Sequence, residues 1–276
     1  MLESRALGSL IESARAFDLS VPLFQGMPIH PNHPQYLFSL KRRHGDLVWP
    51  GGRRGERELT ASGANELIVM TAHSGTHLDA LGHVSCDGRC YGGRDAQAIQ
   101  VGTRGLSELD IASVEPIVCR GVLLDVAGLE NVESLPPGYA VTADHLEAAE
   151  RRQNVKVRAG DAVLINTGWI AHFDDAPRYL GLETGTPGPD ESAARWLVDR
   201  QVRVTGDDTV TYEVIRAGDR SMPVHPILLV EAGIHIIELM NLAAAAKAGV
   251  SECTFVCLPL RIVGGTASPV RPIALV

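Results

Sequence analysis

The stretch His73-Ser-Gly-Thr-His77-Leu-Asp79-Ala-Leu-Gly-His83 decides how this chain is interpreted, because it places four metal-ligating side chains at odd positions. In an extended segment, alternate side chains share a face, so these three imidazoles and one carboxylate are predicted to point the same way. The two glycines of the stretch allow the backbone to bend so that the four groups converge. Histidine and carboxylate are ligands of Zn, Mn and Fe. The spacing therefore predicts a metal site rather than a polar strand whose histidines only satisfy backbone carbonyls.

The composition is that of a soluble globular protein. The chain has 276 residues, of which 45% are hydrophobic and 21% charged, enough for a substantial core. A formal net charge of −8 argues against nucleic acid or an anionic membrane as the main partner. The five cysteines are an odd number, which favours reduced thiols and a cytoplasmic location. No signal peptide and no membrane-spanning run are predicted.

Apolar runs rich in Val, Ile and Leu predict strands after and around the histidine stretch. One run, 66–72, leads directly into it. Further strands are predicted at 117–126, 161–167, 202–206, 252–260 and 270–275. Residues 25–65 are rich in Gly, Pro, His and Arg and are expected to form long loops around short strands.

Helices are predicted between these strands. Thr142 and Asp190 can each cap a helix, and a short helix from Pro226 to Ala232 is expected to end at Gly233. Strands interleaved with helices predict a mixed α/β fold with a sheet covered by helices. We expect one domain over 1–276, with 1–16 as an N-terminal helical arm.

His225 and Glu238 flank a second apolar stretch. Glu238 falls at the end of the predicted strand 234–237, where a carboxylate must be exposed, paired or bound to a cation. Alone, it would be interpreted as a member of an ordinary ion pair. The first cluster has room for further ligands, so His225 and Glu238 are also candidates for a second metal shell.

The first stretch resembles the His-x-Gly-Thr-His-x-Asp-x-x-x-His signature of the cyclase family of metal-dependent hydrolases, which includes kynurenine formamidase and isatin hydrolase. The resemblance covers most of the chain. Its supporting segments are Asp18-Leu-Ser-Val-Pro-Leu, Gly160-Asp-Ala-Val-Leu-Ile-Asn-Thr-Gly-Trp169, Thr186-Pro-Gly, Gly206-Asp207-Asp208 and the stretch from His225 to Leu242. Ala80-Leu81 stands where the family pattern often has proline, which resembles the isatin-hydrolase side of the family.

The resemblance implies a set of roles and a fold. His73, His77 and Asp79 would bind the metal, and His83 would be the catalytic acid or base. In two-metal members a later His and Glu complete the site, here His225 and Glu238. The resemblance further implies one or two divalent ions, Mn²⁺ or Zn²⁺, a compact α/β fold of the swivelling β/β/α type, and a homo-oligomer, either a dimer or a tetramer.

The resulting functional hypothesis is a metal-dependent amide hydrolase that uses an activated water on a small cyclic amide or N-formyl amide, expected to be aromatic. Phe24, Trp49 and Trp169 are candidates to line an aromatic substrate pocket, although core packing explains each equally well.

Three alternatives stay open. A cyclase, lactone hydrolase or lyase acting on a polyketide-like substrate would use the same family fold. A non-haem Fe(II) oxygenase would use His77, Asp79 and His225 but leave His73 and His83 without a role. The third is a non-catalytic metal- or ligand-binding protein. The Asp207-Asp208 pair is expected to stabilise a turn.

Overall fold

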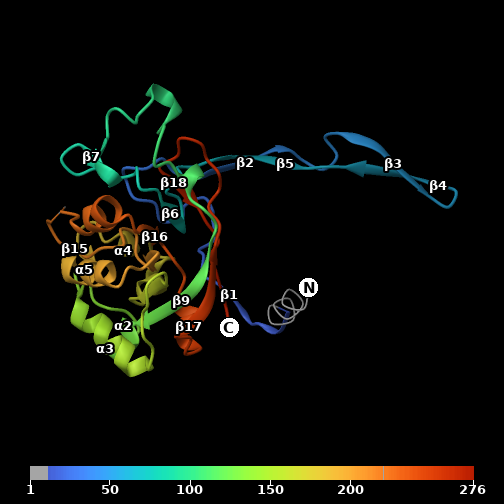
Figure 1. Cartoon of the computed structure of the whole chain (residues 1–276). Coiled ribbons are helices and arrows are strands. Elements are labelled where there is room, and N and C mark those ends of the chain that lie inside the picture. The colour runs from blue at the N-terminus through green and yellow to red at the C-terminus, as the bar shows by residue number, and fades with distance from the viewer. Residues whose placement is uncertain (1–11, 220) are drawn as a thin grey trace, which may run out of the picture.

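A nine-stranded mixed sheet runs through the body of the molecule (Figure 1). The computed structural model describes residues 12–219 and 221–276, so most of the helical arm predicted over 1–16 lies outside the described residues. The strands in spatial order are β1 (Ala16–Asp18), β19 (Ile273–Leu275), β17 (Glu252–Cys257), β9 (Ile117–Asp125), β11 (Ala162–Asn166), β14 (Val204–Asp207), β16 (His235–Glu238), β6 (His77–Asp79) and β18 (Ala267–Pro269).

Four strands in the middle of the sheet, β9, β11, β14 and β16, are parallel to one another. Parallel strands are covered on both faces, and all five residues of β11 are buried. Val163 and Ile165 point into one core cluster, while Ala162 and Leu164 point into another. This alternation places a hydrophobic core on each face of the sheet.

Helices cover the first of these faces, as the sequence predicted. Helix α3 (Ala143–Gln153) begins after Thr142, whose hydroxyl accepts a hydrogen bond from the backbone N–H of His145. Helix α5 (Glu191–Asp199) begins after Asp190 in the same way, through the N–H of Ala193. Together with α2 (Val126–Leu129), these helices gather on one side of the sheet (Figure 1). The predicted mixed α/β fold is confirmed.

The remaining elements are short. They are β7 (Arg89–Cys90), β8 (Arg94–Asp95), β10 (Ala140–Val141), β12 (Gly185–Thr186), β13 (Gly188–Pro189), β15 (Ile215–Arg216), α4 (Ala176–Leu180), α6 (Ala243–Lys247), the 3-10 turns η1 (Tyr91–Gly93), η2 (Gly102–Arg104), η3 (Ile111–Ser113) and η4 (Trp169–His172), and the π-helix η5 (Pro226–Ala232). As predicted, η5 ends at Gly233, which has a left-handed φ of +69°. Among the described residues, no helix combines the length and the apolar character needed to cross a membrane.

A two-stranded β-ribbon over residues 37–69, here called the arm, projects from the body (Figure 1). It consists of β2 (Leu37–Arg42) paired with β5 (Asn65–Val69), followed outward by β3 (Val48–Arg54) paired with β4 (Arg57–Ser62). The sequence predicted loops around short strands here. The strands instead pair along much of the segment, because an antiparallel ribbon satisfies the backbone hydrogen bonds while polar side chains stay in water.

Candidate metal centre

β6 and the turns on either side of it deliver the histidine stretch to one place. Only His77–Asp79 is extended, so the prediction of one extended segment from His73 to His83 is wrong. His73 comes from the turn before β6 and His83 from the turn after it. Gly75 bends the first turn with a φ of +59°, and a Cβ at that position would lie 2.6 Å from Leu23 Cδ2. The groups therefore converge through the predicted bending at glycine, and not through strand alternation alone.

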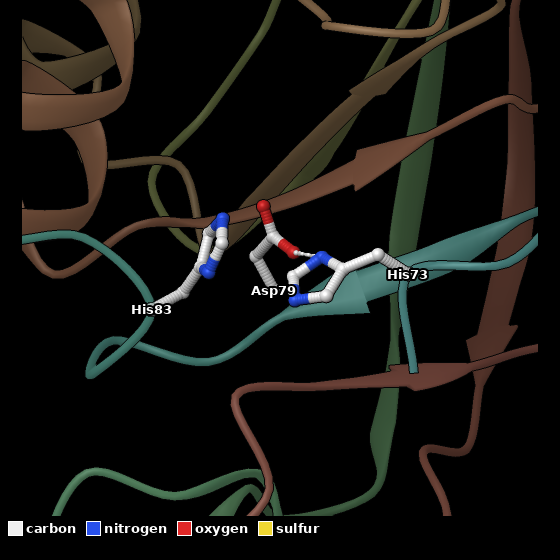
Figure 2. A group of neighbouring side chains, drawn as sticks. All are labelled: His73, Asp79 and His83. Carbon is white, nitrogen blue, oxygen red and sulfur yellow. Dashed lines mark ion pairs between the residues drawn. The ribbon is translucent and has the colours of Figure 1, made fainter. Parts of the chain in front are cut away.

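Asp79 is the centre of the first group of candidate ligands (Figure 2). Its Oδ1 oxygen lies 3.1 Å from His73 Nδ1 and 3.7 Å from His77 Nε2. The rings of His73 and His83 are 4.3 Å apart between centroids. One nitrogen or oxygen from each of His73, Asp79 and His83 lies within 4.8 Å of the other two, which is the spacing of atoms that can share a metal ion.

The sheet register brings Glu238 to the same place. β16 is antiparallel to β6, and Glu238 stands directly opposite His77. Its Oε2 oxygen lies 3.2 Å from His77 Nε2, and its Oε1 oxygen lies 3.3 Å from His225 Nε2. As predicted, Glu238 ends its strand, and the structure buries it. A buried carboxylate is stable only when it is paired or bound to a cation.

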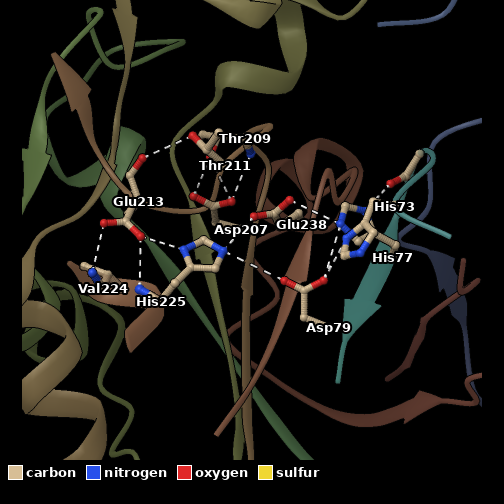
Figure 3. Close-up of polar contacts among 11 residues, drawn as sticks. His73, His77, Asp79, Asp207, Thr209, Thr211, Glu213, Val224, His225 and Glu238 are labelled. Carbon is tan, nitrogen blue, oxygen red and sulfur yellow. Dashed lines mark hydrogen bonds and ion pairs between the residues drawn. The ribbon is translucent and has the colours of Figure 1, made fainter. Parts of the chain in front are cut away.

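Asp79, His225 and Glu238 form a second group, again with ligand atoms within 4.8 Å of one another. His225 Nε2 lies 3.8 Å from Asp79 Oδ2, so the carboxylate of Asp79 faces the first group with one oxygen and the second group with the other (Figure 3). The structure thus brings together all six residues that the sequence proposed as ligands or catalytic groups: His73, His77, Asp79, His83, His225 and Glu238.

Two of the imidazoles are held through the nitrogen that does not face Asp79 or Glu238. His77 Nδ1 is 2.8 Å from the Gly75 carbonyl oxygen, and His225 Nδ1 is 2.6 Å from Glu213 Oε1. An N–H donated from Nδ1 makes Nε2 the nitrogen whose lone pair can bind a cation once the ring is neutral. This orientation of one nitrogen by an acceptor, with the other turned inward, is typical of metal-binding histidines.

Charge pairing raises the pKa of two of these histidines. Burial opposes protonation of His77, but Glu238 and Asp79 outweigh burial and raise the pKa of His77 to about 9. Burial also opposes protonation of His225, where Glu213 and Glu238 raise the pKa to about 10. Without a metal, both rings are therefore protonated on both nitrogens near neutral pH, and their positive charges balance the buried carboxylates.

His83 behaves in the opposite way. Burial lowers the pKa of His83, and the opposing charge of Asp79 does not compensate. His83 is therefore neutral near pH 7 and has a lone pair available to accept a proton.

The residues fit a divalent cation. Among the described residues, His77 Nε2 and both Asp79 oxygens have ion-pair neighbours at 3.1 to 3.8 Å but no hydrogen bond of regular geometry, although all three atoms are buried. Buried polar atoms nearly always have a hydrogen-bond partner, and a cation bound between these atoms would satisfy them instead. Imidazole nitrogens and carboxylate oxygens are the donor set of Zn²⁺ and Mn²⁺.

The two groups open into a cavity of about 510 Å³, a size suited to a small organic molecule. Its lining residues are Pro28, Ile29, His30, Asn32, His33, His73, His77, His83, Val84, Ser85, Val210, Thr211, Met222, His225, Pro226, Glu238 and Leu239. The described lining is aliphatic and imidazole-rich.

The three aromatic residues proposed for the substrate pocket do not line this cavity. Trp169 is buried in the core, where its indole N–H donates to the Tyr179 carbonyl. Phe24 is partly exposed and lies edge-to-face with Phe173. Trp49 is exposed on the arm. The three rings therefore lie in the core or at the surface, and within one chain none of them lines the cavity at the metal centre.

Sequence reasoning missed residues that the fold adds to the site. His33 lines the cavity, and its ring stacks on His73 at 5.3 Å between centroids. His30 lines it too, so the His30-Pro-Asn-His33 spacing was the available signal. Glu213, which accepts from His225, had no sequence signal. The fully buried Asp207-Asp208 pair stands at the end of β14.

Asp207 has the turn role that was expected for the pair, whereas Asp208 bonds to Thr167, just after β11. Asp207 accepts from the Thr209 backbone N–H and hydroxyl, while Asp208 accepts from the Thr167 N–H and hydroxyl. Both carboxylates thus tie down backbone close to the site.

Comparison with known proteins agrees with this geometry. The sequence model of the Cyclase family, described as "Putative cyclase", matches residues 17–214. The isatin hydrolase of Roseibium aggregatum is 28% identical over 214 residues, which are 76% of this chain and 73% of that protein. The kynurenine formamidase of Bacillus cereus is 25% identical over 232 residues, covering 82% of this chain and 90% of that protein. A crystal structure of a novel cyclase has a TM-score of 0.84 and 27% identity, covering 98% of this chain and 91% of the other.

Proposed function

We propose, from the premise that this chain belongs to the Cyclase family, that it is a metal-dependent hydrolase of small amides. The observation that carries the proposal is the Asp79 carboxylate, which faces two histidine-containing groups at the wall of one cavity. The names of the two curated relatives describe hydrolysis of isatin and of a formamide, and both support an amide substrate. The expected substrate is a small cyclic amide or N-formyl amide.

His73, His77, Asp79, His225 and Glu238 are the proposed ligands. A bound divalent ion lowers the pKa of water from about 15.7 to about 7 and polarises a carbonyl oxygen. Two centres that share Asp79 would accommodate two ions, and Mn²⁺ and Zn²⁺ both suit the donor set.

His83 is the proposed acid and base. It lines the cavity, and its lowered pKa leaves it neutral, so it can accept a proton from the attacking water. As the water oxygen bonds to the amide carbon and the C–N bond breaks, the same proton is returned to the departing nitrogen. The products are a carboxylic acid and an amine, which in a cyclic amide remain one molecule.

The position of His73 and His83 bears on the oxygenase alternative. A triad of His77, Asp79 and His225 would leave both of these imidazoles beside the same carboxylate without a function. In the proposed hydrolase His73 is a metal ligand and His83 is the base, so this function gives a role to both residues. Ring closure or lyase chemistry on a polyketide-like substrate would use the same residues, and the substrate test below separates it from hydrolysis.

The arm supports a homo-oligomer of at least two subunits. Apolar side chains oppose one another across it, in the pairs Leu37 with Val69 and Phe38 with Ile68, and all four are exposed. An isolated two-stranded ribbon is at best marginally stable in water, and exposed apolar patches of this kind mark contact surfaces. We therefore propose that a second copy of the chain covers the arm.

Two further expectations stay as proposals. The chain is proposed to fold as one domain over 1–276, because strands from both ends of the described chain, β1 and β19, pair within the one sheet. The cytoplasmic location remains a prediction that rests on the odd number of cysteines.

The decisive experiment is a substrate panel. Purified protein, stripped with a chelator and then loaded with Mn²⁺ or Zn²⁺, is offered isatins, N-formyl anilides and lactones, and acid release is followed. Hydrolysis of the amides in the loaded protein alone is expected. Absence of amide cleavage with either metal, or turnover of the lactones only, would overturn the proposal.

A further inference from the structure

Glu213 is a buried carboxylate that faces His225. Its exposed fraction is 1%, and that of His225 is 3%. Its Oε1 oxygen lies 2.6 Å from His225 Nδ1 and 3.0 Å from the His225 backbone nitrogen. Its Oε2 oxygen lies 2.9 Å from the backbone nitrogen of Val224. Three nitrogens therefore converge on one carboxylate from the start of the π-helix η5 (Figure 3).

The backbone is shaped to hold Glu213 in this position. Tyr212, the residue before it, has a φ of +57°, an uncommon conformation for a non-glycine residue. Tyr212 is fully buried, and its hydroxyl is hydrogen-bonded to Thr205 in β14 at 2.7 Å. Gly188 lies so close that a Cβ there would be 2.3 Å from the Tyr212 carbonyl oxygen. Such strain is kept where the surroundings fix it, often at functional sites.

The bonding pattern determines which nitrogen of His225 carries the hydrogen. The two backbone N–H groups can only donate, so both carboxylate oxygens of Glu213 act as acceptors. Oε1 accepts from one of them and also faces Nδ1. Nδ1 must then be a donor, so Nε2 is the nitrogen that faces Asp79 and Glu238 and that has a lone pair for a cation once its own proton is displaced.

We infer that Glu213 is a positioning residue of the metal centre, which fixes the tautomer and the ring orientation of His225 so that Nε2 can bind a divalent cation. The inference rests on the proposed function in one respect: the divalent cation that His225 binds is the one proposed to activate water for amide hydrolysis. Glu213 is not a catalytic residue, because it does not line the cavity. Acceptors behind metal-binding histidines typically change metal affinity about 10- to 100-fold when they are replaced.

The test compares two buried glutamates. Glu213→Gln keeps the shape of the side chain but replaces one acceptor oxygen by an NH₂ donor. Glu150→Gln is the matched control, because Glu150 in α3 is buried, accepts from the Val157 N–H at 2.7 Å, and is absent from the cavity lining. Zn²⁺ affinity is measured by calorimetry with a competing chelator. We expect a 10- to 100-fold loss for Glu213→Gln and none for Glu150→Gln.

A purely structural role of Glu213 predicts something different. It would lower the melting temperature of the metal-free protein and leave Zn²⁺ affinity equal to that of the Glu150→Gln control, and this result would overturn the inference. If Glu213→Gln does not fold, ring ¹⁵N spectra of the zinc-loaded unsubstituted protein decide instead. A protonated Nδ1 and a zinc-bound Nε2 in His225 support the inference, and the reverse pattern overturns it.

The outcome is separable from the proposed function. Tight Zn²⁺ binding that depends on Glu213, in a protein that cleaves no amide, would refute the hydrolase and keep the positioning role. Amide hydrolysis that survives in Glu213→Gln at unchanged Zn²⁺ affinity would refute the positioning role and keep the hydrolase.

Discussion

Glu238 Oε2 lies 3.2 Å from His77 Nε2, across the antiparallel pair that β16 forms with β6. This one pairing joins the N-terminal histidine stretch to the C-terminal half of the site. It also places Glu238 between two imidazoles, since its other oxygen faces His225 at 3.3 Å.

The first prediction concerns that carboxylate. Glu238→Gln removes one charge and leaves an amide in its place. If two ions bind, elemental analysis should show one ion per chain instead of two, because the second group loses its second carboxylate. An unchanged content of one ion per chain would mean that the unsubstituted protein holds a single ion.

The second prediction concerns His83. His83→Ala should lower kcat at least about 100-fold, the usual scale for loss of a general base, while metal content stays near that of the unsubstituted protein. His145→Gln, in α3 and outside the cavity lining, is the control. Loss of the metal in His83→Ala would reassign His83 as a ligand, in line with its place beside His73 and Asp79.

The third prediction concerns pH and the metal-free protein. The folded-state pKa values of His77 and His225, about 9 and about 10, lie above the ordinary value of 6.5. A raised pKa gives stability that is complete below pH 6.5 and is lost as pH rises through the folded-state values. One pKa unit is worth about 1.4 kcal/mol, so the loss between pH 6.5 and 10 should be on the order of a few kcal/mol. Denaturant unfolding of chelator-treated protein across this range measures it.

The fourth prediction concerns metal binding and pH. A bound metal should oppose the loss of stability that the metal-free protein shows as pH rises. A cation takes the place of the protons on His77 and His225, so its binding should release protons and tighten as pH rises toward 9. Calorimetry in buffers of different ionisation enthalpy measures the number of protons released. Binding with no proton release would contradict the assignment of these two histidines as ligands.

The fifth prediction concerns the arm. Ile68→Asp places a charge beside Phe38 on its exposed apolar face and should shift the protein from oligomer to monomer. Light scattering after size-exclusion chromatography gives the mass. Glu66→Gln, on the same strand, is the control and should leave the assembly unchanged. A monomer before any substitution would refute the proposed oligomer.

Much of the fold was predictable because its signals are local. Thr142 and Asp190 cap their helices through hydrogen bonds three residues away, and Gly233 ends η5 with a positive φ. The buried strand β11 is an apolar run up to its terminal Asn166, and β9 and β17 are rich in apolar and β-branched residues. Each of these signals acts within a few residues, so the sequence alone displays it.

The arm and the aromatic residues were not predictable in the same way. Trp49 follows the apolar pair Leu47-Val48 and Trp169 precedes the apolar pair Ile170-Ala171, yet one tryptophan lies exposed on the arm and the other is fully enclosed in the core. Their positions depend on whether a strand has a sheet to pack on, and that is a property of the whole fold.

By itself, the sequence determined the chemistry of the centre: His73, His77, Asp79 and His83 lie within eleven residues, so any fold that bends at Gly75 keeps them near one another. Only the tertiary structure decided how His225 and Glu238, which the sequence had already proposed, are brought to it, and only the structure added Glu213. Glu238 arrives through the register of two strands, and Glu213 arrives through the strained turn at Tyr212. The physical reason is that a ligand's type is a property of one residue, whereas the distance between distant residues is set by packing and register.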